Sequence, residues 1–226
     1  MDNIRAVLFD VDNTLIDFNK SSFIAVKSAF TQFNLPFDEQ TFKVFIESND
    51  YLWSMIEKGQ LTREQMFKLR FKRVLEKLSL SGDVDGLEVA FRKALYDVAV
   101  PIDGAREILE YLNAKYTLYT ASNAIYAQHI HRLDLAGLKG YFADFFTSEK
   151  FGYQKPSKQF FDCCFSSMKF SPDQTVMIGD SLCADIGGGK DYGLKTIWFN
   201  YAKKEFNEKI NADFTVDKLC QIRKIL

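Results

Sequence analysis

Two acidic residues stand two positions apart directly after a short apolar run near the N-terminus. The run covers residues 4–9, and Asp10 and Asp12 follow it. Alternate residues of an extended chain point to the same side, so both carboxylates can face one cleft, where a divalent cation would offset their repulsion. Thr14 can hold the loop beyond them through its hydroxyl. The spacing predicts metal-assisted chemistry on phosphate, although a solvated turn explains the pair equally well when it is taken alone.

A hydroxyl and an amide close the apolar run at residues 116–121. Ser122 and Asn123 stand where this predicted strand ends. Open α/β sheets bind ligands beyond the carboxyl ends of their parallel strands, so these two residues are predicted to hold phosphate oxygens. The alternative for both is an ordinary helix N-cap.

A lysine follows at the next polar segment. Lys155 precedes Pro156, and a proline suits the first turn of a helix, so we expect Lys155 at a helix start. A cation at that place opposes the helix dipole and needs an anionic partner. A bound phosphoryl group or the Asp10 carboxylate would be that partner, with an exposed lysine as the alternative.

A second pair of acids follows the apolar run at 175–178. Asp180 stands at the expected strand end, where it could ligate the same cation, and Asp185 could support the lysine or the water shell of the metal. An N-cap role for Asp180 and a surface position for Asp185 are the alternatives. The glycines at 187–189 do not form a nucleotide-binding P-loop, because Ala184 occupies the place of the first required glycine, and they favour close packing instead.

Short apolar runs alternate with helical stretches over most of the chain, which predicts an α/β core with a parallel sheet between helices. Residues 17–98 differ, because their apolar residues recur at helical spacing. We expect about four helices there, inserted as a lid after the first acids. The predicted domains are a core of residues 1–16 and 99–226 and a helical cap of residues 17–98. The predicted strands are 4–9, 116–121, 175–178 and 196–199.

One helix of the insertion can be outlined in more detail. Residues 62–65 have a capping-box pattern, which marks a helix start. Its apolar stripe is formed by Phe67, Phe71, Val74, Leu75 and Leu78. The basic residues between them are predicted to form a solvated face; they are Lys68, Arg70, Lys72, Arg73 and Lys77.

Composition excludes several classes of protein. The formal charge of the 226 residues is -1, so the chain lacks the basic field that a nucleic-acid polymer requires. Four cysteines without a CxxC and only two histidines support neither a disulfide framework nor a zinc site. No run reaches the length of a membrane span. We expect a cytoplasmic protein that binds a small phosphorylated molecule and no membrane.

The four polar segments, in this order, resemble the motifs of the haloacid dehalogenase-like hydrolase superfamily over essentially the whole chain. The resemblance implies a Rossmann-like core with an inserted helical cap of the C1 type, and an Mg²⁺-dependent phosphomonoester hydrolase. It implies that Asp10 forms an aspartyl-phosphate while Asp12 protonates the leaving oxygen and then activates water. Dehalogenases of this superfamily typically lack an acid at the position of Asp12, which favours phosphoryl chemistry.

The resemblance also assigns ligands around these two acids. Magnesium would be bound by Asp10, Asp180 and the backbone carbonyl of Asp12. The phosphate would be bound by Ser122, Asn123 and Lys155, with Thr14 and Asp185 in supporting positions.

Within the superfamily, the segments 52–64, 179–181 and 195–200 look like the bacterial 5'-nucleotidases that act on pyrimidine and noncanonical nucleoside monophosphates. The expected substrate is therefore a nucleotide, and the expected assembly is a monomer or weak dimer. Alternatives are a sugar-phosphate phosphatase or phosphomutase of the same superfamily and a non-catalytic binding protein. The residues that could set substrate specificity are Phe18, Tyr51 and Trp53, although cap aromatics more often belong to the core.

Overall fold

The computed structural model describes residues 1, 3–205 and 210–226. The chain forms two compact units, which are Met1–Asp17 with Val100–Leu226, and Phe18–Ala99. The chain leaves and re-enters the first unit at neighbouring points, because Ile16 and Pro101 form an antiparallel bridge. The backbone N–H of Asp17 also donates to the carbonyl of Val100 at 2.7 Å.

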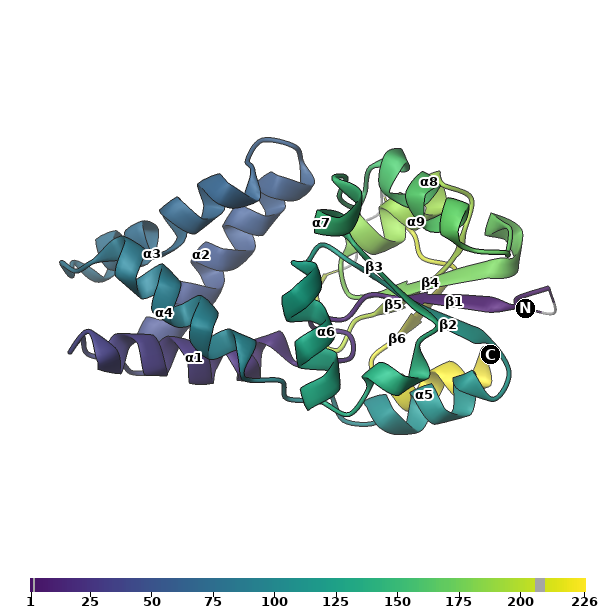
Figure 1. Cartoon of the computed structure of the whole chain (residues 1–226), viewed down its shortest axis with the longest axis horizontal. Helices are drawn as coiled ribbons and strands as arrows, with labels where there is room; N and C mark the ends of the chain where they lie inside the picture. Colours follow the sequence, from purple (N-terminus) through teal and green to yellow (C-terminus); the bar gives the residue numbers. More distant parts are fainter. Residues whose placement is uncertain (2, 206–209) are drawn as a thin grey trace. The chain divides into compact units, whose positions relative to one another are not determined.

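The first unit is built on a six-stranded parallel sheet with the order β3-β2-β1-β4-β5-β6 (Figure 1). Helices lie against it, with α8 and α9 on one side and α5 on the other. The predicted α/β fold is therefore confirmed. The strands are β1 (Ala6–Phe9), β2 (Thr117–Ser122), β3 (Asp144–Thr147), β4 (Thr175–Gly179), β5 (Lys195–Phe199) and β6 (Phe214–Val216).

Strand β1 decides where a ligand can bind. All four of its residues are buried, as expected for a strand enclosed between two helical layers. Its last residue, Phe9, is in register with Thr120 of β2 and with Ile178 of β4. The strand order reverses on either side of β1, and open α/β sheets bind ligands in the crevice at such a switch point. Residues just beyond Phe9, Thr120 and Ile178 therefore share that edge of the sheet.

Five α-helices, three 3-10 turns and one π-helical turn complete the described part of this unit. Helix α8 covers one face of the sheet, where Phe160 and Phe161 pack with Leu8, Tyr119 and Met177. The helices are α5 (Ala105–Asn113), α6 (Tyr126–Leu135), α7 (Ser148–Phe151), α8 (Lys158–Ser167) and α9 (Gly188–Asp191). The turns are η1 (Lys139–Tyr141), η2 (Pro172–Gln174), η3 (Leu182–Gly187) and η4 (Leu219–Lys224).

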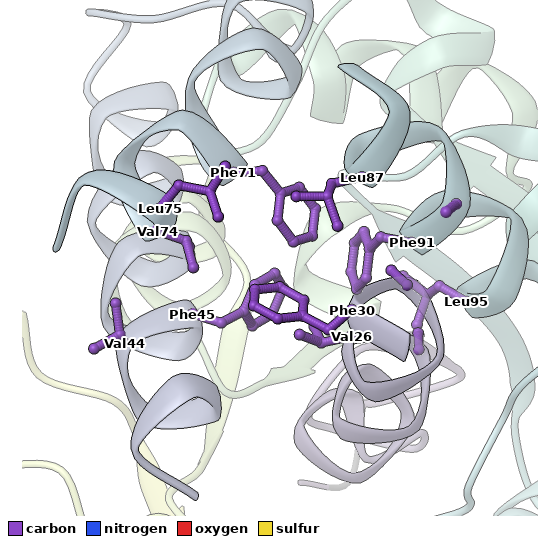
Figure 2. Packing of buried hydrophobic residues seen from close by; sticks show 13 residues of the cluster. Val26, Phe30, Val44, Phe45, Phe71, Val74, Leu75, Leu87, Phe91 and Leu95 are labelled. Atoms are coloured by element: carbon purple, nitrogen blue, oxygen red, sulfur yellow. The ribbon is translucent and has the colours of Figure 1, made fainter. Parts of the chain in front are cut away.

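The second unit consists of four helices around an aromatic core. They are α1 (Phe18–Gln32), α2 (Glu39–Glu57), α3 (Arg63–Leu78) and α4 (Val84–Tyr96). Figure 2 shows the rings of Phe30, Phe45, Phe71 and Phe91 gathered at the centre of this core. Ring centroids of Phe45 and Phe91 lie 5.1 Å apart, and those of Phe71 and Phe91 lie 5.6 Å apart. Such aromatic pairs stabilise a core beyond their buried area.

Sequence signals explain where α2, α3 and α4 begin. The predicted capping box is present, with Thr62 and Gln65 each bonded to the backbone of the other. Asp38 and Asp83 cap α2 and α4 by accepting from backbone N–H groups three residues on. Each cap satisfies N–H groups that have no partner inside the helix.

The predicted solvated face of α3 is wrong at Arg70, which is only 4% exposed. Its Nε donates to Glu88 Oε2 at 3.0 Å and its Nη1 donates to Asn49 Oδ1 at 3.1 Å. The guanidinium also stacks over the Phe91 ring, 4.6 Å from its centroid. Arg70 is buried because acceptors on two neighbouring helices meet its donors there.

Two expectations about the elements of the first unit need correction. Pro156 does not lie in the first turn of a helix, because α8 begins at Lys158 with Ser157 as its N-cap. Strands β3 and β6 were not expected, since both are short and begin or continue with polar residues. Among the described residues, no helix combines the length and apolar character needed to cross a bilayer.

Candidate active site

Three carboxylates meet at the switch point of the sheet. Asp10 follows β1, and its backbone N–H donates to the carbonyl of Ile178 in β4 at 2.8 Å. Asp180 follows β4, and Asp185 lies in the helical turn η3 beyond it. One carboxylate oxygen from each of the three lies within 4.8 Å of the others. Asp185 belongs to the cluster itself, where the sequence suggested only a supporting place.

Lys155 neutralises two of these carboxylates. Its Nζ lies 2.9 Å from Asp10 Oδ1 and 2.6 Å from Asp185 Oδ1, and it also donates to the carbonyl of Ala121. The residue is 1% exposed, so the alternative of an exposed lysine is wrong. Asp10, one of the two partners expected for this cation, is observed beside it, together with Asp185.

Asn123 holds the backbone on which Lys155 stands. Its Nδ2 donates to the carbonyl of Lys155 at 2.9 Å, and its Oδ1 accepts from the N–H of Lys155 at 2.8 Å. The N-cap of α6 is Ile125, with no side-chain hydrogen bond, so Asn123 and Ser122 are not helix caps. Ser122 ends β2 and is buried at the same edge of the sheet.

The backbone around the second acid pair, Asp180 and Asp185, holds Asp185 in the cluster. A Cβ on Gly179 would lie 2.2 Å from Asp185 Oδ2, so this position must be glycine for Asp185 to enter the cluster. The N–H of Ser181 donates to the same oxygen at 3.0 Å, and Ser181 is the N-cap of η3. Asp185 is 1% exposed, so its predicted surface alternative is wrong. The N-cap alternative for Asp180 is also wrong, because Ser181 holds that place. Close packing of the later glycines is confirmed at Gly188, where a Cβ would lie 2.9 Å from Pro156.

Burial shifts the pKa values of the charged groups in this cluster. Loss of solvent raises the pKa of Asp10 to about 7; Lys155 opposes this rise and Asp185 adds to it. Burial likewise raises the pKa of Asp180 to about 6, although the ammonium of Lys204 opposes it. Burial by itself would lower the pKa of Lys155, but the two carboxylates outweigh it and raise that pKa. The cluster is therefore short of positive charge at neutral pH.

The donor set fits a divalent cation of the magnesium type. Magnesium prefers oxygen ligands and binds through one or two carboxylates together with water or phosphate oxygens. Asp10 and Asp180 offer such oxygens, and an added cation would favour their ionised forms. The chemistry of these side chains therefore matches the metal that the sequence implied.

The loop after β1 holds the other acid of the first motif. Thr14 Oγ1 donates to Asp10 Oδ2 at 3.2 Å, so the expected support of this loop by Thr14 takes the form of a direct bond. Asn13 adopts a left-handed conformation, with φ of 61°. Asp12 accepts from Arg132 of α6, with 2.6 Å between Oδ1 and Nη1. The loop thus presents Asp10 to Lys155 and Asp12 to Arg132.

Sequence reasoning missed two cations of this site. Arg132 lies inside α6 without any motif around it, and Lys204 lies in the loop after β5, with Nζ 2.9 Å from Asp180 Oδ2. The carbonyl of Asp180 also accepts from Trp198 Nε1 at 3.0 Å. Folding alone brings Arg132 and Lys204 to the two acids, and no local sequence pattern predicts either residue.

The three predicted specificity residues lie in the second unit. Phe18 packs against its aromatic core, and Trp53 packs against a smaller cluster of Leu52, Ile56 and Met66. Tyr51 is 46% exposed, and the guanidinium of Arg73 lies 4.2 Å from the centroid of its ring. Of the three, Tyr51 presents the most open aromatic ring.

The sequence profile described as haloacid dehalogenase-like hydrolase matches residues 7–199. The chain is similar to the HAD-hydrolase YfnB of Bacillus subtilis, whose magnesium-bound crystal structure has a TM-score of 0.94 and 34% identity and covers 99% of this chain and 98% of that one. It is 33% identical to pyrimidine 5'-nucleotidase PynA of Streptococcus pneumoniae, over 87% of this chain and 84% of PynA. It is 30% identical to pyrimidine 5'-nucleotidase YjjG of Escherichia coli, over 97% of this chain and 96% of YjjG.

Proposed function

The chain belongs to the haloacid dehalogenase-like hydrolase family, and we propose that it is a phosphatase that hydrolyses phosphate monoesters, with Asp10 as the nucleophile. One observation carries this proposal. The carboxylate of Asp10 is bonded to the buried ammonium of Lys155 and to Thr14, beside the carboxylate of Asp180. Phosphoryl transfer to a carboxylate requires a buried nucleophile, a fixed cation and a pair of acids that can bind a metal ion.

The proposed reaction has two steps. The Asp10 carboxylate forms a bond to phosphorus while the phosphorus–oxygen bond of the ester breaks, and Asp12 gives its proton to the departing alkoxide. A water molecule then attacks the aspartyl-phosphate, Asp12 takes up its proton, and inorganic phosphate and free Asp10 result. Lys155 and the hydroxyl of Ser122 offset the charge of the transferring group.

Magnesium is the proposed metal, and it would be held by the carboxylates of Asp10 and Asp180 and the backbone carbonyl of Asp12. Bound there, it supplies positive charge that neutralises the phosphoryl oxygens. The raised pKa values of Asp10 and Asp180 support this, because both acids need more positive charge than Lys155 and Lys204 provide. A nucleophilic Asp10 must be ionised, so the reaction and the metal are coupled through this residue.

We propose a nucleoside 5'-monophosphate, most readily a pyrimidine nucleotide, as the substrate. The two nucleotidases named above support this choice through their similarity over most of the chain. In the second unit, the half-exposed ring of Tyr51 is the proposed surface for stacking a base. Phe18 and Trp53 are the other two proposed specificity residues. Sugar phosphates are the alternative substrates.

The test measures magnesium-dependent phosphate release from UMP, dUMP and a set of sugar phosphates. We expect turnover of the two nucleotides well above that of the sugar phosphates, and loss of activity in Asp10→Asn and Asp12→Ala. Asp144→Asn is the matched control, because its carboxylate pairs with Lys150 at the start of β3, away from the cluster. The reverse order of substrates would overturn the nucleotidase proposal, and an active Asp10→Asn protein would overturn the phosphatase mechanism.

A further inference from the structure

We propose that Arg132 is a positioning residue that holds the carboxylate of Asp12 in the orientation needed for proton transfer. This role deepens the proposed function and rests on it. The primary observation is the short ion pair between Arg132 Nη1 and Asp12 Oδ1, at 2.6 Å. Both residues belong to the first unit, so the pair is internal to that unit.

The burial of the two partners is unequal. The side chain of Arg132 is 5% exposed, whereas that of Asp12 is 37% exposed. An open carboxylate on a loop would otherwise sample several rotamers, and a fixed guanidinium restricts it. Anchoring through Oδ1 assigns the proton transfer to Oδ2, the other oxygen of the same carboxylate. The buried partner therefore fixes the direction in which the open partner faces the reacting ester.

Arg132 is itself held in place by the helix that carries it. One turn earlier in α6, His129 Nε2 lies 2.8 Å from Thr120 Oγ1 of β2, with both residues buried. Burial lowers the pKa of His129 to about 4, so the imidazole is neutral near pH 7 and does not compete with Arg132 for the carboxylate of Asp12. Thr120 is in register with Phe9 of β1, and Phe9 is the residue directly before Asp10. Through this contact the sheet holds α6 in place, and α6 in turn positions the guanidinium of Arg132.

A purely structural ion pair would give a different result from a positioning pair. If the pair were purely structural, its loss would change the stability of the protein and leave the chemical step untouched. A positioning role instead predicts a loss that depends on the leaving group. A nucleoside alkoxide needs a proton from Asp12 in order to leave, whereas nitrophenolate leaves without one.

The experiment compares Arg132→Met and Arg132→Lys with the wild-type protein on UMP and on p-nitrophenyl phosphate. For Arg132→Met we expect kcat on UMP to fall by roughly 10- to 100-fold, part of the usual contribution of general acid–base catalysis, with KM changed less than about twofold. The rapid burst of nitrophenolate should be retained and be followed by slow turnover, because the second step still needs Asp12. Arg132→Lys should recover part of the loss on UMP. Lys139→Met, which removes an exposed pair with Asp134, is the control.

A double variant isolates the pathway of the effect. If Arg132 acts through Asp12, then adding Arg132→Met to Asp12→Asn should cause no further loss of kcat. The role would be overturned if the kcat losses of the two single variants multiplied in the double variant. It would also be overturned if Arg132→Met lost the nitrophenolate burst and UMP turnover equally. If Arg132→Met does not fold, Arg132→Lys carries the same comparison, since it keeps a cation and a long apolar stem.

The result also separates this inference from the proposed function. A wild-type protein that releases phosphate from neither substrate overturns both. A wild-type protein that is active on UMP, with an equally active Arg132→Met variant, overturns the role of Arg132 alone.

Discussion

Replacing the carboxylate of Asp180 by an amide should stabilise the protein when magnesium is removed by a chelator. A rise of the pKa of Asp180 from 3.8 to about 6 corresponds to roughly 3 kcal/mol that the folded state loses when this group ionises. Asp180→Asn removes that cost. It also removes the partner of Lys204, a half-exposed ammonium, which offsets the gain by about 1 kcal/mol or less. The expected net gain is about 2 kcal/mol, or about 4–8 °C in Tm for a chain of this size.

The pH dependence of this gain has a definite sign. Because the folded pKa of Asp180 lies above its unfolded value, its contribution to stability is complete below about pH 4 and is lost as the pH rises through about 6. The advantage of Asp180→Asn should therefore be full near pH 7.5 and fall to roughly a third near pH 4.5. Differential scanning calorimetry of both proteins at the two pH values measures it.

Magnesium and a second variant complete this test. Magnesium at about one hundred times its Kd should stabilise the wild-type protein by about 3 kcal/mol, and the variant by much less. Asp213→Asn is the matched control of opposite sign, because hydrogen bonds from Thr196 outweigh burial and lower the pKa of Asp213. It should lose stability at neutral pH. An Asp180→Asn protein that is no more stable than wild type in chelator, or one that gains as much from magnesium, would refute the reasoning.

Two further variants test the buried charges and the helical core. Lys155→Met should cost about 3–5 kcal/mol in urea unfolding, because it leaves two buried carboxylates without their ammonium, whereas the exposed Lys158→Met should cost little. Equal effects of the two would contradict the buried pairing. Phe91→Ala should destabilise the helical unit by about 3–5 kcal/mol, because it empties the centre of the aromatic cluster, while Val89→Ala on the exposed face of the same helix should not. A calorimetric transition that stays in place in Phe91→Ala would show that this packing is not what stabilises the unit.

The parts of the site that follow strands could be predicted because a parallel sheet collects the ends of its strands at one edge. Asp10 follows β1, Ser122 ends β2 and Asp180 follows β4, and apolar runs mark those strands in the sequence. Lys155 could be predicted for a different reason, since a cation there needed an anionic partner. The structure supplies Asp10, although the helix expected at Pro156 begins later.

Residues without a local pattern could not be placed in advance. Arg132 reaches Asp12 from α6, a helix that is hydrogen-bonded to β2 through His129 and Thr120, and nothing near Arg132 in the sequence indicates this. Arg70 resembled one of several surface cations, and its burial depends on Glu88 and Asn49, which come from two other helices. Such pairs depend on tertiary contacts that periodicity does not describe.

The bridge between Ile16 and Pro101 has a consequence for how such proteins diversify. It joins the two connections to the helical insertion side by side, outside the six strands of the sheet. A gene segment that encodes a longer, shorter or differently folded insertion can therefore be exchanged at this place without shifting the register of any strand. The proposed reaction residues of the first unit and the proposed specificity residues of the second can then evolve at separate rates.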